Sequence, residues 1–230
     1  MATPANVISD SDSDGEYCKY WINWFLNTKG NEFFCDIDEE YILDRFNLTG
    51  LPAEVPHFQQ AMELITDELD ENNYTEEEFN DFYRSAKHLY GLIHARYILT
   101  NRGLMKMLEK FKNSDFGRCP RIYCSQSSVL PIGVTDVPGE SPVRLYCPRC
   151  EDVYIPKSSR HNAIDGAYFG TSFCQMLIQT YPVLKEMNPE PVLRHVPKIF
   201  GFKIHKYAQL HRWQDRQREL QAERLKNPIQ

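Results

Sequence analysis

The sequence contains no run of about twenty consecutive apolar residues, the length that a bilayer-spanning helix needs, so it predicts no membrane span and no membrane partner. No apolar leader segment follows Met1, and the seven cysteines are an odd number, which argues against a secreted protein held by disulfides. We therefore expect a protein of a reducing compartment, located in the cytoplasm and the nucleus.

Recognisable catalytic motifs are also missing. The sequence has no G-x-S-x-G, no H-E-x-x-H and no phosphate-binding P-loop, and its carboxylates fall in runs without an acid/base pair. Asp115-Phe116-Gly117 matches the magnesium motif of protein kinases, but no glycine-rich phosphate loop or His-Arg-Asp catalytic loop precedes it. None of these residues looks catalytic, and we predict no catalytic residue.

Positive charge is scarce in the first third of the chain. Residues 1–80 carry 19 Asp and Glu against 3 Lys and Arg, whereas residues 81–230 carry 13 against 23, and the net charge is −6. Ser9, Ser11 and Ser13 each precede an acidic residue by three positions. We predict that residues 1–16 are a disordered acidic tail whose serines are phosphorylated; a merely solubilising tail is the alternative.

Four of the cysteines have the spacing of a zinc ribbon. Cys119 and Cys124 form a C-x4-C pair, and Cys147 and Cys150 form a C-P-R-C knuckle after 22 further residues. Pro120 and Pro148 follow the first and third thiols and fix the backbone of the two turns. An all-cysteine shell leaves no open coordination position, so we predict one structural Zn²⁺ per chain. Four unrelated buried or disulfide-forming cysteines are the alternative.

Helical signals fill residues 17–113. Thr75 and Glu78 have the spacing of a capping box, and an apolar stripe follows as far as Tyr97. Asp38 is the predicted N-cap of an earlier helix that extends to Phe46, and Pro56 opens another. His88 and His94 fall within the long helix, and we interpret them as structural groups because no second set of metal ligands accompanies them.

Beyond Ser114 the sequence becomes rich in proline, glycine and β-branched residues. Segments 129–134, 143–146 and 153–155 predict a three-stranded sheet around the metal, and a helix near 172–181 and a strand over 198–204 follow. The predicted fold class is α+β: an acidic tail (1–16), an all-α domain (17–113), a small zinc-ribbon β domain (114–173), a C-terminal helix with a strand or hairpin (174–205) and a polar tail (206–230).

Several blocks of the sequence resemble the regulatory beta subunit of casein kinase II. They are Gly30-Asn31-Glu32-Phe33-Phe34-Cys35, Leu130-Pro131-Ile132-Gly133, Lys157-Ser158-Ser159-Arg160-His161, Gly201-Phe202-Lys203-Ile204-His205 and the segments 46–51, 89–103, 119–124 and 165–170. The resemblance implies a non-catalytic homodimer, joined through two zinc ribbons, that carries two catalytic alpha subunits in an α2β2 tetramer. Such a subunit modulates the stability, activity and substrate choice of the kinase.

The resemblance also assigns roles to individual residues of this chain. It implies dimer contacts at Pro120, Ile122, Val153 and Tyr154, and docking of the catalytic subunit at Phe200, Gly201, Phe202 and His205. It further implies an acidic regulatory loop for polyamines and other basic ligands at Asp67, Glu68, Asp70 and Glu71, although Asn72-Asn73-Tyr74 interrupts the acidic run here.

Two other classes of function fit a zinc ribbon. A nucleic-acid-binding or transcription-associated ribbon would display basic and aromatic residues, but residues 117–160 hold six Lys and Arg against four Asp and Glu, and a tetrathiolate zinc centre adds about −2. A zinc-dependent enzyme would need an open coordination position. The sequence therefore favours a protein without a nucleic-acid partner.

Overall fold

A computed structural model describes residues 20–70, 73–186, 196–205 and 207–226. The chain divides into two compact units, Met1–Glu190 and Pro191–Gln230. Helices and small antiparallel sheets occur together, which confirms the predicted α+β class. Among the described residues, no helix has both the length and the apolar character that crossing a membrane requires.

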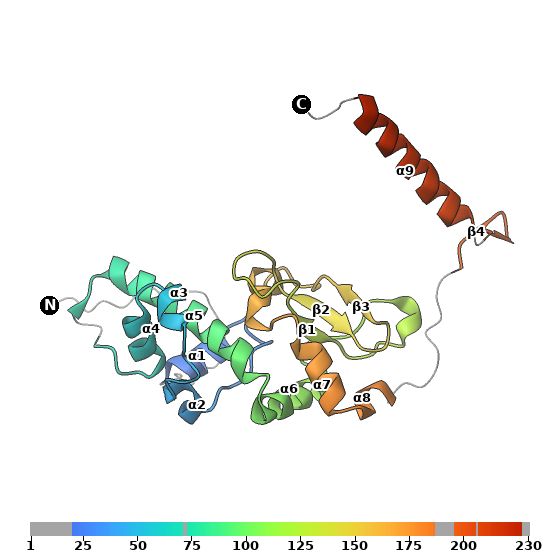
Figure 1. Cartoon of the computed structure of the whole chain (residues 1–230). Coiled ribbons are helices and arrows are strands. Elements are labelled where there is room, and N and C mark those ends of the chain that lie inside the picture. The colour runs from blue at the N-terminus through green and yellow to red at the C-terminus, as the bar shows by residue number, and fades with distance from the viewer. Residues whose placement is uncertain (1–19, 71–72, 187–195, 206, 227–230) are drawn as a thin grey trace. The chain divides into compact units, whose positions relative to one another are not determined.

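Six α-helices are described between residues 20 and 113 of the first unit. They are α1 (Trp21–Asn27), α2 (Glu39–Leu43), α3 (Leu51–Glu54), α4 (Phe58–Ile65), α5 (Glu76–Tyr97) and α6 (Asn101–Asn113). Figure 1 shows α6 following beyond the end of α5, and α4 packs along α5. Aromatic rings fill the space between α1 and α5: Trp21 stacks on Phe25 with ring centroids 5.2 Å apart, and Phe25 lies 4.9 Å from Tyr90.

The long helix α5 begins as the sequence predicts. The Thr75 hydroxyl accepts the N–H of Glu78, and the Glu78 carboxylate accepts the N–H of Thr75 at 2.9 Å, so the capping box is complete. The stripe is buried from Phe82 to Tyr97. Helix α6 starts after Thr100, whose hydroxyl accepts the N–H of Gly103 at 3.1 Å.

The helix predicted after Asp38 is shorter than expected. Asp38 does precede α2, but its carboxylate makes no capping hydrogen bond, and α2 ends at Leu43. The prediction that this helix reaches Phe46 is wrong. The Asp44 carboxylate accepts the N–H of Phe46 at 2.9 Å, and such a local side-chain bond offers the backbone a turn in place of a further helical turn.

A three-stranded antiparallel sheet follows the helices, as predicted. Its strands are β1 (Leu130–Ile132), β2 (Arg144–Cys147) and β3 (Asp152–Tyr154), in the order β1-β2-β3. Three short 3-10 helices lie in the loops of this region: η2 (Ile122–Cys124), η3 (His161–Ala163) and η4 (Gly166–Tyr168). Helix α7 (Phe173–Thr180) packs against β1, and α8 (Val183–Glu186) comes next.

The second unit differs from the sequence-based expectation. Residues 198–204 form a hairpin of β4 (Lys198–Ile199) and β5 (Phe202–Lys203), which confirms the C-terminal hairpin of the predicted fold class. The prediction of a single strand over these residues is wrong. Phe200 and Gly201 form the turn, with φ of 49° and 84°. Two successive positive φ angles characterise a type I′ turn, which reverses the chain within two residues. Helix α9 (Ala208–Lys226) occupies most of the predicted polar tail.

Candidate metal centre

The four predicted ligands come together in the first unit. Cys124 ends η2, Cys147 ends β2 and Cys150 lies in the turn between β2 and β3. Cys119 follows Arg118, which forms an isolated bridge with Ser128. The sulfurs of Cys119 and Cys150 are 3.8 Å apart, those of Cys124 and Cys147 are 3.5 Å apart, and all four lie within 4.8 Å of one another. All four side chains are buried. The structure thus gives the C-x4-C and C-x2-C pairs a common centre.

The spacing of the sulfurs fits a tetrahedral metal ion. Zn–S bonds of about 2.3 Å place the sulfurs of a tetrahedral site roughly 3.8 Å apart, whereas a disulfide would join two sulfurs at about 2.05 Å. Backbone groups fix the second pair, because the N–H of Cys150 points to the Cys147 sulfur at 3.4 Å. These residues can therefore hold a metal ion with a closed thiolate shell.

Burial makes Cys124 and Cys147 depend on a cation for ionisation. Desolvation raises the pKa of Cys147 to about 11, and desolvation together with the neighbouring thiols also raises the pKa of Cys124. Metal binding requires thiolates, and a dication at the centre supplies the charge that stabilises them.

Two arginines and a tyrosine surround the cysteines. Arg149 donates to the carbonyl of Cys124 at 2.8 Å, and Arg121 forms an ion pair with Asp152 of β3. The Arg121 guanidinium also lies 6.0 Å from the ring of Tyr154. The loop between the first two cysteines is therefore tied both to the knuckle and to β3.

The sequence-predicted dimer contacts lie around the edge strand β3 of this centre. Ile122 is 90% exposed and Val153 is 50% exposed, and Pro120 is exposed as well. Tyr154 is half-buried. Because neighbouring residues of a strand point to opposite faces, Asp152 and Tyr154 face the Arg121 side, whereas Val153 faces away from it. Exposed apolar side chains thus flank a metal centre at the edge of a sheet.

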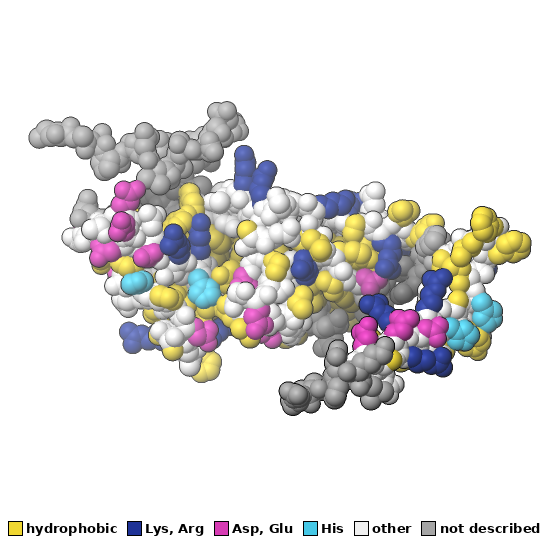
Figure 2. Space-filling model, turned by 90° about the horizontal axis from the view of Figure 1, so that it is seen from above, with side chains coloured by type: hydrophobic (Ala, Val, Ile, Leu, Met, Phe, Trp, Pro, Cys, Tyr) yellow, Lys and Arg dark blue, Asp and Glu magenta, His cyan; other side chains and the backbone are white. Residues whose placement is uncertain are grey.

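The predicted docking residues lie in the second unit. Phe200 is 97% exposed at the turn of the β4–β5 hairpin, and Phe202 is 79% exposed on β5. Figure 2 shows apolar side chains protruding at the hairpin end of this unit. The N–H of Tyr207 donates to Nδ1 of His205 at 3.3 Å, and the His205 carbonyl accepts the N–H of Ala208 at the start of α9. His205 thus joins the hairpin to the helix.

One residue of the predicted acidic loop, Asp67, has a structural role. Asp67, at a φ of 59°, accepts the backbone N–H of Trp21 at 2.8 Å and so holds the start of α1. Asp70 accepts the side-chain amide of Asn73 at 3.0 Å. Glu68 is exposed, whereas Glu71 and the predicted phosphorylation sites Ser9, Ser11 and Ser13 lie outside the described residues.

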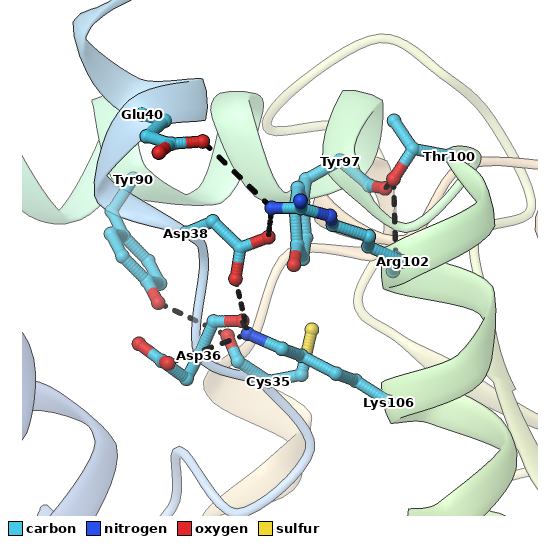
Figure 3. A network of polar contacts seen from close by, with 10 residues as sticks. Cys35, Asp36, Asp38, Glu40, Tyr90, Tyr97, Thr100, Arg102 and Lys106 are labelled. Carbon is cyan, nitrogen blue, oxygen red and sulfur yellow. Dashed lines mark hydrogen bonds and ion pairs between the residues drawn. The ribbon is translucent and has the colours of Figure 1, made fainter.

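Sequence reasoning missed a charged network between the segment before α2 and the start of α6 (Figure 3). Lys106 contacts the carboxylate of Asp38 at 2.8 Å and that of Asp36 at 3.4 Å, and Arg102 contacts Asp38 at 3.1 Å. The hydrogen bond from Lys106 is the main cause that lowers the pKa of Asp38 to about 2. The pairs lie more than 60 positions apart in sequence, so no local pattern could reveal them.

Comparison with known proteins places the chain in a family. The family model "Casein kinase II regulatory subunit" matches residues 20–203, which include the four cysteines and Phe200. Casein kinase II subunit beta-2 of Neurospora crassa is 54% identical over 216 residues, covering 94% of this chain and 75% of that protein.

Two yeast proteins are similar to nearly the whole chain. Casein kinase II subunit beta of Schizosaccharomyces pombe is 55% identical over 94% of this chain and 92% of its own length. Casein kinase II subunit beta' of Saccharomyces cerevisiae is 52% identical over 96% of this chain and 87% of its own length. Together with the clustered cysteines, these matches confirm the predicted resemblance. The chain belongs to the casein kinase II regulatory subunit family, and is a regulatory rather than a catalytic chain.

Proposed function

We propose that this protein is a zinc-bound homodimer that carries two casein kinase II catalytic alpha subunits in an α2β2 tetramer. In this role it modulates the stability, activity and substrate choice of the kinase, which acts on protein substrates. The four thiols need a reducing environment to bind metal, which supports the proposal that the protein resides in the cytoplasm and the nucleus.

One observation carries the proposal: the two compact units each expose an apolar surface. The first surface contains Ile122 and Val153 beside the four cysteines, and the second contains Phe200 and Phe202 on the hairpin. Exposed apolar patches mark interaction sites in soluble proteins. Two such surfaces match a subunit that binds a second copy of itself with one and a catalytic partner with the other.

The hairpin turn gives independent support for a docking role. Phe200 has a φ of 49°, a conformation that is uncommon for a bulky residue and that asparagine or glycine adopts more easily. Backbone strain of this kind costs about 1–3 kcal/mol and is concentrated at functional sites. A strained and fully exposed aromatic residue fits an anchor for a partner better than a part of the fold.

Zinc is the ion that the donor set favours. Four thiolates in a closed tetrahedral arrangement are typical of structural Zn²⁺, since the soft sulfur ligands suit zinc better than magnesium, calcium or manganese. When bound, the ion would be held by Cys119, Cys124, Cys147 and Cys150. It would join the η2 loop to the β2–β3 turn and stabilise the module by cross-linking them.

Measurement of mass in solution tests the assembly. We expect the purified chain to have the mass of a dimer, and to gain two catalytic subunits per dimer when a casein kinase II alpha subunit is added. Metal analysis of the same sample should give one zinc per chain. A monomer that does not bind the catalytic subunit but binds DNA with an affinity that falls as salt rises would instead favour the nucleic-acid-binding alternative.

Phosphorylation and basic ligands belong to the same proposal. Ser9, Ser11 and Ser13 precede acidic residues, and each phosphate adds about −1.5 to −2 charges, so one modification strengthens the acidic pattern for the next serine. Incubation of the complex with ATP, followed by peptide mass spectrometry, should find phosphate on residues 1–19. An unmodified peptide contradicts this.

The exposed Glu68 leaves part of the acidic loop open to polyamines.

A further inference from the structure

Buried polar atoms without a partner gather around the metal centre. Among the described residues, five buried side-chain atoms lack a hydrogen-bond partner of normal geometry: Trp21 Nε1, the Tyr97 hydroxyl, one terminal nitrogen of Arg121, Arg149 Nε and the Tyr154 hydroxyl. The last three belong to the short segment that holds the four cysteines. A buried donor left unpaired costs about 1–3 kcal/mol, so three of them together need an explanation.

The chain places all three residues next to the ligands. Arg121 lies between Cys119 and Cys124 in sequence, and Arg149 lies between Cys147 and Cys150. The Asp152 carboxylate accepts from one terminal nitrogen of Arg121, and the Cys124 carbonyl accepts from one terminal nitrogen of Arg149. Each guanidinium is thus held in place while another of its nitrogens stays unpaired. Tyr154 approaches the centre from β3, where burial and then the neighbouring sulfurs of Cys150 and Cys119 raise the pKa of its hydroxyl.

The charge of a loaded centre accounts for these donors. Four thiolates around a divalent ion carry a net charge of about −2 in a buried position. Two guanidinium groups supply about +2, of which the Asp152 carboxylate paired with Arg121 offsets about −1, so the arginines neutralise part of the charge of the centre. A sulfur that binds a metal retains lone pairs that accept hydrogen bonds. Donors that appear unpaired beside neutral thiols therefore acquire acceptors once the thiols become metal-bound thiolates.

We propose that Arg121, Arg149 and Tyr154 form an outer layer of donors to the metal-bound thiolates, and that this layer sets how tightly and how long the ion is held. The inference rests on the proposed zinc site and adds the residues that tune it. Arg149 and Arg121 neutralise part of the charge of the metal-bound sulfurs, and the Tyr154 hydroxyl directs one further hydrogen bond to the Cys119–Cys150 side. Tyr154 acts as a positioning residue for the metal centre through its hydroxyl.

Metal competition measures the effect directly. Full-length wild-type protein and the variants Arg121→Met, Arg149→Met and Tyr154→Phe are titrated with a chromogenic chelator, and zinc release is followed over time. Loss of partners around metal ligands typically costs 10- to 100-fold in metal affinity, so we expect each arginine variant to bind zinc at least about tenfold more weakly. Tyr154→Phe keeps the ring and removes the hydroxyl, and we expect a smaller loss, of a few fold.

Matched variants separate this role from general stability. Arg118→Met removes an exposed arginine directly beside Cys119 and should leave zinc affinity unchanged, whereas Arg149→Lys keeps the charge and should recover part of it. The absorption spectrum of the cobalt-loaded protein reports on the thiolate ligands themselves, and it should shift in Tyr154→Phe.

The possible outcomes are distinguishable. A wild-type protein that binds no zinc contradicts the metal site itself. A zinc-bound wild type whose Arg121, Arg149 and Tyr154 variants all keep its affinity, release rate and cobalt spectrum overturns the outer layer alone. Equal losses in Arg118→Met and Arg149→Met would overturn it too, because charge anywhere on the module would then suffice.

Discussion

His94 shows how a single side chain joins distant parts of the first unit. It is fully buried in α5, where its Nε2 accepts the N–H of Cys35 at 3.1 Å and its Nδ1–H donates to the carbonyl of Tyr168 at 2.9 Å. Both bonds need the neutral ring, because Nε2 must be an acceptor. The prediction that His94 is a structural group agrees with these contacts. The Tyr90 hydroxyl donates to the Cys35 carbonyl at 3.0 Å, so Cys35 is held from two sides.

The neutral state of His94 predicts acid sensitivity. Burial lowers the pKa of His94 from 6.5 to about 4, so its contribution to stability is complete above pH 6.5 and is lost as the pH falls through 4. The shift corresponds to about 3 kcal/mol. We expect the stability advantage of wild type over His94→Asn, measured by urea unfolding, to shrink between pH 6.5 and 4. Since acid releases zinc from both proteins, only a pH-independent difference would contradict this role.

Gly91 is required by a neighbour that is remote in sequence. A Cβ at this position of α5 would stand 2.5 Å from the ring of Tyr168 in η4. We expect Gly91→Ala to lower the free energy of unfolding by about 1–3 kcal/mol despite the better helix propensity of alanine. Combining it with Tyr168→Ala should remove most of the additional cost, as a double-mutant cycle would measure. If the effects of the two substitutions were additive, the cost of Gly91→Ala would not come from its contact with Tyr168.

At the scale of elements, the C-terminal hairpin of the predicted fold class is confirmed, whereas the single strand over 198–204 and the polar tail without a predicted helix depart from the structure. The single strand over 198–204 fails because Phe200 and Gly201 take positive φ angles that no extended strand contains. Helix α9 was not anticipated because its residues show little apolar periodicity. Its many Gln, Arg, Leu and Glu residues are nevertheless good helix formers, and intrinsic propensity explains a helix whose side chains remain largely exposed.

We expect substitution of the exposed aromatic residues of the hairpin to weaken docking of the catalytic subunit and to leave the rest of the protein unchanged. We expect Phe200→Ala with Phe202→Ala to weaken binding of the catalytic subunit at least about a hundredfold, roughly 2.7 kcal/mol, because two exposed aromatic anchors would be removed. Zinc content and the mass of the dimer should not change. Calorimetric titration measures the affinity.

Two controls sharpen this test. Phe200→Asn suits the type I′ turn better than phenylalanine and should keep the hairpin while still losing affinity. Phe46→Ala removes another exposed phenylalanine, from the first unit, and should bind normally. Full affinity in the hairpin variants, or unfolding of the double variant, would show that docking lies elsewhere.

At the scale of the whole molecule, the metal centre would cross-link short strands whose apolar residues, such as Leu130 and Leu145, are also buried in a core. The strands β1, β2 and β3 contain only three or four residues each, and α7 covers one of them. A structural zinc site in a small module contributes on the order of 10 kcal/mol of apparent binding energy. The fold of this region, and the exposed surface at Ile122 and Val153 that it presents, should therefore depend on all four thiols.

Removal of one ligand should accordingly separate the subunits. We expect Cys119→Ser or Cys147→Ser to lose zinc, to unfold the module partially and to be monomeric at low micromolar concentration. Sedimentation and metal analysis would check both effects. Cys35→Ser is the matched control, because Cys35 is buried outside the cluster and should leave zinc and mass unchanged. A Cys119→Ser protein that stays dimeric would contradict a zinc-dependent dimer.

The sequence alone determined the features that depend on residues close together in the chain. The Thr75 capping box, the three short strands and the pairing of cysteines by spacing depend on residues a few positions apart, and the structure confirms the first two and clusters the four thiols. Only the tertiary structure decided which distant groups meet. The bonds of His94 to Cys35 and Tyr168, the contact of Lys106 with Asp38 and the bonds of the two arginines around the thiols join residues 25 to 74 positions apart. These contacts form only when the chain folds, because burial and charge pairing act between residues that are close in space. A local sequence pattern therefore cannot predict them.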